Sequence, residues 1–295
     1  MNWFPLLPLA IMLALSAVLG RLPSRLHPSW SARLLATTGA MTAVAALGTG
    51  VFVAINYAAT LAPSAAARVP EWALFGDDRP VPDALGVAAA VLSAAGLLVT
   101  ARTAVRWSGE LRAARARTGE PLDTDVPIAV AVPGRHGGVM VSRGLLRDLT
   151  PAELQVVFEH EASHLRHRHH RYLAAGILVA ALLPPLRPLD GRLRLAVERW
   201  ADEDAAEATG DRAAVARTLA KVALAQPRTS PAAAFAESGV VERVEALLGT
   251  PPAKNPVTGP LLFMGNGVVT GSLAAATLQL DHVIASFLLS LLAFR

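Results

Sequence analysis

The sequence predicts a mainly α-helical membrane protein that also carries a small domain of mixed helix and strand. The chain of 295 residues is 53% hydrophobic and has a mean hydropathy of +0.42, which is high for a soluble protein. Four uncharged apolar runs have about the length that a helix needs to cross a bilayer. Between the third and fourth runs the sequence changes to short apolar stretches around a Gly-rich turn and to amphipathic, charged segments.

The apolar runs predict about four transmembrane helices. They occupy residues 4–20, 34–62, 84–100 and 261–280. A helix of about 20 residues crosses a hydrocarbon core of about 30 Å, and a shorter run can cross if the bilayer thins slightly. We interpret the first run as a retained anchor and not as a signal peptide, because no Lys or Arg precedes it and no small-residue cleavage site follows it.

Charge asymmetry predicts the orientation of these spans. The first loop contains Arg21, Arg25 and Arg33 without any acidic residue, whereas the second loop is rich in Asp and Glu. By the positive-inside rule the first loop is cytoplasmic, and the chain returns to the cytoplasm after the third span. The sequence thus predicts three membrane helices in residues 1–100, a cytoplasmic-facing domain in 101–260, and a last membrane helix and tail in 261–295.

Composition restricts the chemistry of this domain. The formal charge is +4, but the arginines cluster near the ends of apolar runs, so direct binding to nucleic acid is not expected. The chain has no cysteine, and any bound metal must therefore use histidine and carboxylate ligands.

The cytoplasmic-facing domain is expected to begin with a β-hairpin and a well-defined helix. Two short apolar runs, in residues 125–133 and 139–142, flank a Gly-rich turn. Thr150, Pro151 and Glu153 then combine an N-cap hydroxyl, a proline in the first helical turn and a capping-box glutamate. A helix is therefore predicted to begin directly after Thr150.

The sequence His160-Glu161-Ala162-Ser163-His164 lies on this helix. Residues four apart share one helical face, so both imidazoles can reach one metal ion while Glu161 projects beside it. A catalytic zinc ion takes three protein ligands and keeps its fourth position for water. The pattern predicts Zn²⁺ bound by His160 and His164, with Glu161 as the base that acts on the water. The alternatives are histidines that only cap or line a core, and a metal site without peptidase activity.

The third ligand must come from another helix, and the downstream segment offers Glu198 and Asp202 one turn apart. We predict Glu198 as the ligand. Asp202 is expected to accept the free ring N–H of a zinc-bound histidine and so fix its tautomer. The alternative is a solvated acidic face, because other carboxylates follow directly in the sequence.

Residues 172–186 form a short apolar segment that ends in Pro184 and Pro185. If Glu198 and the two histidines bind one ion, this segment must leave and return on the same side of the membrane. It is therefore either a re-entrant hairpin or a buried element at the membrane surface. The basic run at residues 166–171 is interpreted as a membrane-contacting surface, with a second metal site as the alternative.

These motifs resemble membrane metallopeptidases of the BlaR/MecR antirepressor type, which are gluzincins related to the HtpX and CAAX prenyl protease peptidases. The resemblance covers roughly residues 125–210. It rests on three elements, namely Gly144-Leu145-Leu146, His160-Glu161-x-x-His164 with Leu165-Arg166-His167-Arg168, and Glu198-Arg199-Trp200-Ala201-Asp202. It implies a zincin-like α+β metallopeptidase domain, Glu198 as the third zinc ligand and an active site that faces the cytoplasm. The β-lactam sensors carry a penicillin-binding domain after their last span, and this chain ends at Arg295 without one.

The sequence therefore predicts a multi-pass integral membrane zinc metalloendopeptidase whose partners are the lipid bilayer and a protein or peptide substrate. The resemblance implies regulated proteolysis of a cytoplasmic protein such as a transcriptional repressor. The alternatives are HtpX-like quality control of membrane proteins and a non-catalytic membrane sensor in which zinc is structural. The presence of Glu161 argues against the sensor, because a structural site does not need a base.

Overall fold

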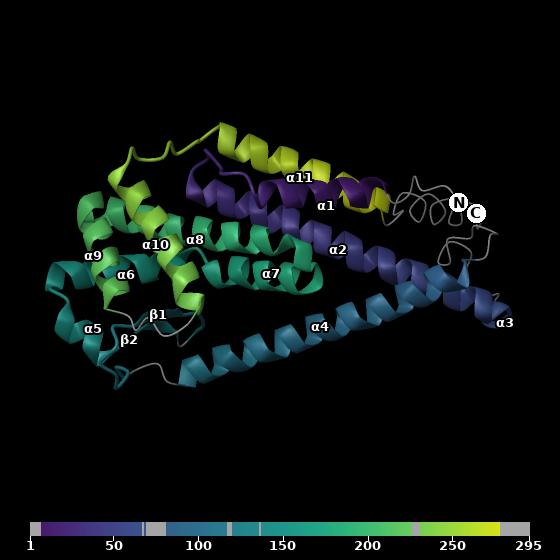
Figure 1. Cartoon of the computed structure of the whole chain (residues 1–295), viewed down its shortest axis with the longest axis horizontal. Helices are drawn as coiled ribbons and strands as arrows, with labels where there is room; N and C mark the ends of the chain where they lie inside the picture. Colours follow the sequence, from purple (N-terminus) through teal and green to yellow (C-terminus); the bar gives the residue numbers. More distant parts are fainter. Residues whose placement is uncertain are drawn as a thin grey trace, which may run out of the picture.

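The computed structural model describes residues 7–66, 68, 81–116, 120–135, 137–225 and 231–277, with the side chains of 231–238 and 277 left undescribed. The molecule is elongated and mostly helical (Figure 1). Long helices run along its length, and a group of shorter helices with a two-stranded sheet lies at one end.

Three helices are long and apolar enough to cross a membrane, which indicates a membrane protein. They are α2 (Pro28–Leu61), α4 (Asp83–Ala116) and α11 (Thr258–Thr277). The apolar helix α1 (Leu7–Leu19) has 13 residues, which is short for a span. Because residues 4–6 lie outside the described part, the fourth span stays a prediction.

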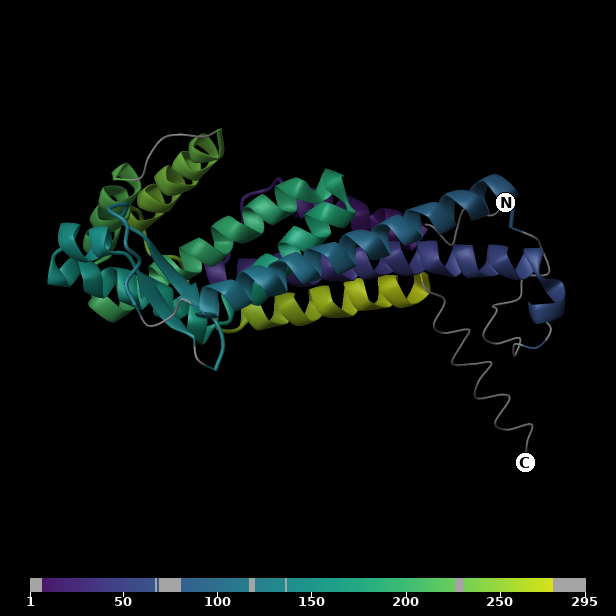
Figure 2. The same ribbon diagram turned by 90° about the horizontal axis from the view of Figure 1, so that it is seen from below.

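The long helices pack through small and polar side chains. Helix α2 contacts both α4 and α11, and Figure 2 shows the three running along the same axis. Thr38 of α2 donates a hydrogen bond to Asn266 of α11 at 2.9 Å, and Ser16 of α1 lies 2.8 Å from Thr42 of α2. Such contacts suit a lipid environment, where burial of apolar surface between helices supplies little driving force.

Helix α4 continues beyond the apolar run that predicted it. The run ends at residue 100, whereas the helix extends unbroken to Ala116. With a rise of 1.5 Å per residue, its 34 residues span about 51 Å, well over the thickness of a hydrocarbon core. Its last turns therefore project towards the sheet, where Arg115 Nε donates a hydrogen bond to the carbonyl of Pro133 at 2.7 Å.

The predicted hairpin and capped helix are confirmed. Strands β1 (Ala129–Val132) and β2 (Gly138–Val141) pair antiparallel, with Ala131 opposite Val139. After the short helix α5 (Arg143–Asp148), helix α6 (Pro151–Arg166) begins with a complete capping box between Thr150 and Glu153. This cap satisfies backbone N–H groups of the first turn and fixes where the helix begins.

The chain returns on itself after α6, as expected if Glu198 and the two histidines bind one ion. Helix α7 (His169–Leu182) is followed by a short 3₁₀ turn at Pro184–Leu186 and then by α8 (Arg187–Thr209), which packs against α7, α6 and α2. Leu189, Leu193 and Val197 of α8 are buried in the largest apolar cluster, which also includes residues of α2. The turn thus brings α8 back beside α6.

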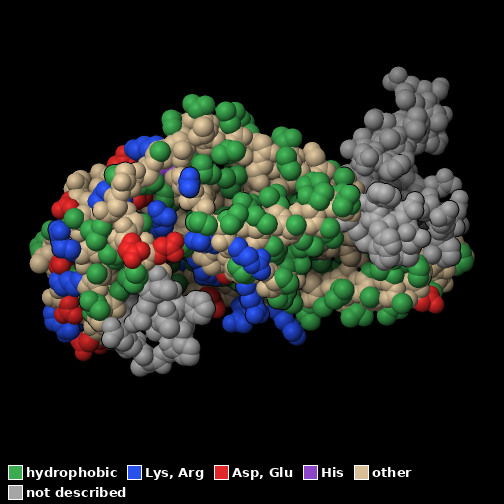
Figure 3. Space-filling view, turned by 45° about the horizontal axis from the view of Figure 1, so that its top comes forward, with side chains coloured by type: hydrophobic (Ala, Val, Ile, Leu, Met, Phe, Trp, Pro, Cys, Tyr) green, Lys and Arg blue, Asp and Glu red, His purple; other side chains and the backbone are tan. Residues whose placement is uncertain are grey.

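Two further helices complete the end of the molecule that carries the two-stranded sheet, which we call the compact end. Helix α9 (Arg212–Leu224) begins at an Asp211 cap, and α10 (Pro231–Leu248) packs against α9 and α8. A segment with Pro251, Pro252 and Pro256 then leads into α11. On the face in Figure 3, most acidic side chains lie at this end, and hydrophobic side chains cover much of the elongated remainder of the molecule. The acidic loop around Asp77 and the tail 281–294 lie outside the described residues.

The contact between Gly86 of α4 and the Tyr57 ring of α2 generates a prediction. A Cβ atom at Gly86 would overlap the ring close to its attachment point, whereas a Cβ at Gly265 of α11 meets nothing within 4 Å. We expect Gly86→Ala to lower the free energy of unfolding by about 1–3 kcal/mol through overpacking. Gly265→Ala should be neutral or stabilising, because alanine favours helix. Thermal unfolding in detergent compares the two, and equal midpoints would contradict the close packing.

Candidate metal centre

His160, His164 and Glu198 converge on one point at the compact end. One potential ligand atom from each lies within 4.8 Å of the others. His160 Nε2 lies 3.2 Å from His164 Nε2 and 3.4 Å from Glu198 Oε2, and His164 Nε2 lies 3.6 Å from Glu198 Oε1. The two histidines come from α6 and the glutamate comes from α8.

These separations fit a tetrahedral metal site. Ligand atoms at about 2.0 Å from a tetrahedral zinc ion stand about 3.3 Å apart along each edge. The three observed separations of 3.2, 3.4 and 3.6 Å match that edge. Two imidazoles and a carboxylate are also a donor set that zinc uses in catalytic sites. The three side chains are therefore placed so that one tetrahedral metal ion could contact all of them.

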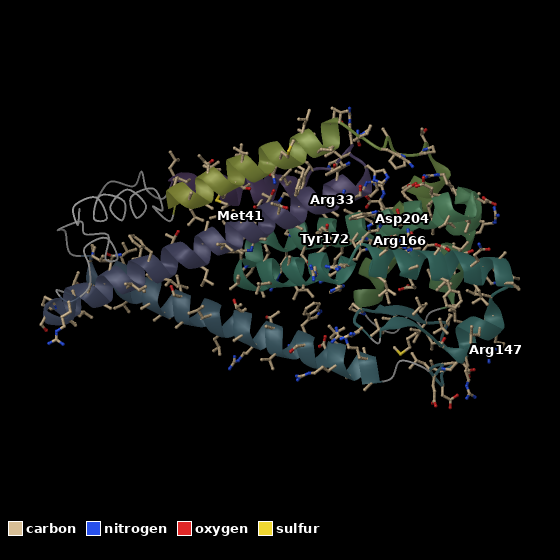
Figure 4. The ribbon with its side chains drawn as sticks, turned by 180° about the vertical axis from the view of Figure 1, so that it is seen from behind. Arg33, Met41, Arg147, Arg166, Tyr172 and Asp204 are labelled. Carbon is tan, nitrogen blue, oxygen red and sulfur yellow. The ribbon has the colours of Figure 1, made fainter. Side chains whose placement is uncertain are left out.

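A partly buried carboxylate of α8 is hydrogen-bonded to α6. Asp204 of α8 accepts a hydrogen bond from Ser163 at 2.7 Å and lies 2.9 Å from His167 Nε2. Arg166 lies 3.6 Å from the same carboxylate. Figure 4 shows Asp204 and Arg166 together where the two helices meet. Because Ser163 immediately precedes His164, the bond from Ser163 to Asp204 joins the two helices directly beside a proposed ligand.

Asp202 of α8 lies beside the ring of His160. Its Oδ1 lies 3.0 Å from Nδ1 of His160, the ring nitrogen that faces away from the metal position. An acceptor here keeps a proton on Nδ1 and leaves Nε2 free for a metal. Asp202 is almost fully buried, and a buried carboxylate requires a compensating charge.

Arg243 of α10 supplies that charge, and nothing in the sequence pattern pointed to it. It donates two hydrogen bonds of 2.7 Å to Asp202 and lies 3.1 Å from Glu198 Oε2. With Glu161 included, three carboxylates face one guanidinium, and a divalent ion would neutralise the remaining charge. This balance is a second observation that fits a bound divalent metal.

The pKa values of the two histidines are shifted in opposite directions. Burial lowers the pKa of His164 to about 4, so this ring is neutral at pH 7. Burial also opposes a proton on His160, but Asp202 and Glu198 outweigh it and raise the pKa of His160 to about 10. For Glu198, burial acts to raise the pKa, yet His160 and Arg243 hold it well below its usual range. A metal at Nε2 of His160 must therefore displace a proton.

Glu161 lies between the metal position and the sheet. Its Oε2 accepts a hydrogen bond of 2.7 Å from the backbone N–H of Ala131 in β1. Burial raises the pKa of Glu161. A carboxylate whose pKa is raised is a better proton acceptor, which suits a general base.

Two cavities meet at the metal position. The larger, about 1600 Å³, extends between α6, α8, α9 and α10 and has mostly apolar walls that include Val157, Leu195 and Leu219. The smaller, about 330 Å³, extends towards Leu165 and Leu173 at the start of α7. Both are lined by β1, His160, Glu161 and Glu198. A polypeptide could therefore pass across the metal position from one cavity to the other.

Sequence reasoning was wrong about part of the basic run. His169 is fully buried, so its ring belongs to the interior and does not form a membrane-contacting surface, whereas the partly exposed His167 binds Asp204. Their alternation with exposed arginines concealed this. The strand beside Glu161 is β1, through the backbone N–H of Ala131.

Comparison with protein families supports this chemistry. The model of Peptidase family M48 matches residues 123–187, a segment that contains both histidines and Glu161 and ends before Glu198. Family M48 comprises metal-dependent peptidases, so the match and the three apolar helices indicate a membrane-associated metallopeptidase. Comparison with curated proteins and with solved structures gives no match.

The contact between Asp202 and His160 generates a second prediction. Asp202→Asn keeps the shape of the side chain but removes the charge that orients His160 and pairs with Arg243. We expect zinc affinity to fall about 10- to 100-fold. Competition with a chromogenic chelator measures this. Asp190→Asn is the matched control on the same helix, because Asp190 pairs with Arg194 and not with a metal ligand. Equal affinities in both variants would contradict the role of Asp202.

Proposed function

We propose that this protein is a membrane-bound zinc metalloendopeptidase in which His160, His164 and Glu198 hold Zn²⁺ and Glu161 is the catalytic base. The convergence of three ligand atoms at the edge lengths of a zinc tetrahedron carries the proposal. The M48 match over the two histidines and Glu161 supports it independently.

Glu161 is placed to move protons during hydrolysis. Zinc in such a site supplies Lewis acidity towards water and towards a peptide carbonyl. The Glu161 carboxylate accepts the proton that a nucleophilic water loses, and its raised pKa helps it to hold that proton. It then delivers the proton to the leaving amine, so the carboxylate is regenerated.

The outer edge of β1 is suited to bind an extended substrate. The carbonyl of Ile128 accepts a hydrogen bond from the N–H of Ser142, the residue directly after β2, and the N–H of Ala131 points to the opposite side. Because alternate residues of a strand point the same way, the backbone groups of Ala129 also face away from β2. A substrate added as a strand here would lie beside Glu161.

The charge distribution supports a cytoplasmic active site. The loop before α2 carries Arg21 and Arg25, and the end of α4 carries Arg112 and Arg115. Both lie at the end of the molecule that holds the metal centre. By the positive-inside rule this end faces the cytoplasm. A cytoplasmic protein is therefore the leading class of substrate, and the resemblance to antirepressor-type peptidases adds regulated cleavage of a transcriptional repressor as the specific proposal.

The smaller cavity favours a second candidate, which is quality control of membrane proteins. It is lined by Leu173 of α7, and α7 packs directly against α2 and α4. A substrate that emerges from the bilayer beside these helices could enter from this side.

Glu161→Gln tests the catalytic proposal. The amide keeps the volume of the side chain but cannot accept a proton, so turnover of an unstructured protein should fall by at least about 100-fold. The variant should still bind one zinc ion per chain, which metal analysis of the purified protein establishes. Turnover that survives this substitution would exclude Glu161 as the base. Zinc binding without Glu161-dependent cleavage of any polypeptide would favour the non-catalytic sensor.

Quantitative proteomics of cells with the wild-type chain or Glu161→Gln distinguishes the two substrate classes. Accumulation of one cytoplasmic protein would support regulated proteolysis. Accumulation of many membrane proteins would support quality control instead.

Ala129→Pro tests strand addition. Proline removes an N–H that faces away from β2, so the hairpin should persist while a substrate loses a main-chain hydrogen bond. We expect KM to rise severalfold with zinc content unchanged. Steady-state kinetics on a peptide substrate measure this, and an unchanged KM would exclude the edge of β1 as the binding strand.

A further inference from the structure

His169 lies directly behind one of the proposed zinc ligands. It is the first residue of α7, and its side chain has no exposed surface. Its Nδ1 atom lies 3.0 Å from Nδ1 of His164, which is hydrogen-bond distance. The two rings stand nearly perpendicular, with centroids 4.8 Å apart. His169 therefore contacts the nitrogen of His164 that faces away from the metal position.

Only one arrangement of protons is compatible with a metal at His164. Its Nε2 points towards His160 and Glu198, so this atom must offer its lone pair to the metal. A neutral imidazole then carries its proton on Nδ1. His164 must accordingly donate the hydrogen bond, and Nδ1 of His169 must accept it.

The acceptor is held rigidly in place. The His169 ring packs against Trp200 of α8 and against Tyr172, with centroid separations of 4.7 and 6.2 Å. Arg168 adopts a left-handed conformation with φ of 55°, which lets α7 begin immediately after α6 ends. This sharp turn folds His169 back against His164, only five residues earlier.

The protonation of the other ring nitrogen of His169 follows from this arrangement. With Nδ1 as acceptor, Nε2 holds the proton, and it is buried without a hydrogen-bond partner among the described residues. Buried donors are rarely left unpaired in folded proteins. The opposite tautomer would place a proton on Nδ1 of His169 and remove the acceptor that the described residues offer to Nδ1 of His164. The unpaired N–H is thus explained by the need for an acceptor on the other side of the ring.

We propose that His169 is a positioning residue for the metal centre. Its Nδ1 accepts the Nδ1–H of His164, fixes the tautomer of that ring and aims Nε2 at the zinc. The two zinc-binding histidines are then oriented by different partners, His160 by the Asp202 carboxylate and His164 by a neutral imidazole. The inference rests on the proposed function only in taking zinc as the ion that is bound.

Two substitutions of equal shape isolate this hydrogen bond. Asparagine places an amide oxygen close to the position of Nδ1, and leucine places a methyl group there. Both leave the same space where the outer part of the ring was. We expect His169→Asn to keep zinc affinity near that of the wild-type chain. His169→Leu should raise the Kd for zinc about 10- to 100-fold. Chelator competition on the full chain in detergent measures the zinc affinity of the wild-type chain and of both variants. Equal zinc affinities of the asparagine and leucine variants would overturn the proposal.

His167→Leu is the matched control. His167 belongs to the same aromatic cluster, with its ring 5.7 Å from that of His169, but it binds Asp204 and not a proposed ligand. Its loss should change zinc affinity far less than His169→Leu does. An equal loss in both leucine variants would show that only packing of the cluster matters, and would overturn the proposal. If the wild-type chain itself binds no zinc, the proposed function is wrong. That outcome is distinct from a wild-type chain that binds zinc without any contribution from His169.

A measurement on the wild-type chain keeps the proposal testable if the leucine variant does not fold. In zinc-loaded protein with ¹⁵N-labelled histidine, the NMR spectrum should show a scalar coupling between two ring nitrogens across an N–H···N hydrogen bond. The proton should reside on Nδ1 of His164. A spectrum in which His164 Nδ1 carries no proton, or in which no such coupling occurs, would overturn the proposal.

Discussion

The return of the chain from α7 into α8 is the constraint on which the metal centre depends. The histidines end α6, and the third ligand follows 34 positions after His164, beyond an apolar helix. A helix that crossed the bilayer in between would place Glu198 on the wrong side. The turn at Pro184–Leu186 prevents this, because proline cannot continue the hydrogen-bonding ladder of a helix. Packing against α2, α6 and α7 then holds helix α8 in this returned position.

Charge compensation is the second requirement. Asp202, Glu198 and Glu161 lie close together in partly or fully buried positions, which is unfavourable unless positive charge is present. Arg243 provides one charge from α10, a helix that contributes no proposed ligand. The proposed divalent ion provides the other two. Helix α10 therefore matters for the centre through the charge of Arg243 as well as through the apolar cavity that it lines together with α9.

Much of this arrangement could be predicted from local sequence, and the rest could not for a physical reason. The capping box at Thr150, the hairpin and the face shared by His160 and His164 depend on residues a few positions apart. Three apolar runs matched helices of spanning length, since hydropathy reports directly on transfer into lipid. Arg243 and the contact of Ala131 with Glu161 arise from packing between distant elements, which leaves no periodic signal.

Helix α4 joins parts of the molecule that are far apart. Near one end it packs against Tyr57 through Gly86, and near the other Arg115 holds the carbonyl that follows β1. A rod of about 51 Å pivoted at one end acts as a long arm. Tilting it by about 5° would displace its other end by roughly 4 Å, more than the length of a hydrogen bond. Through Arg115, a change in the tilt of α4, a helix long and apolar enough to cross a membrane, would reach the edge of β1 that lies beside Glu161.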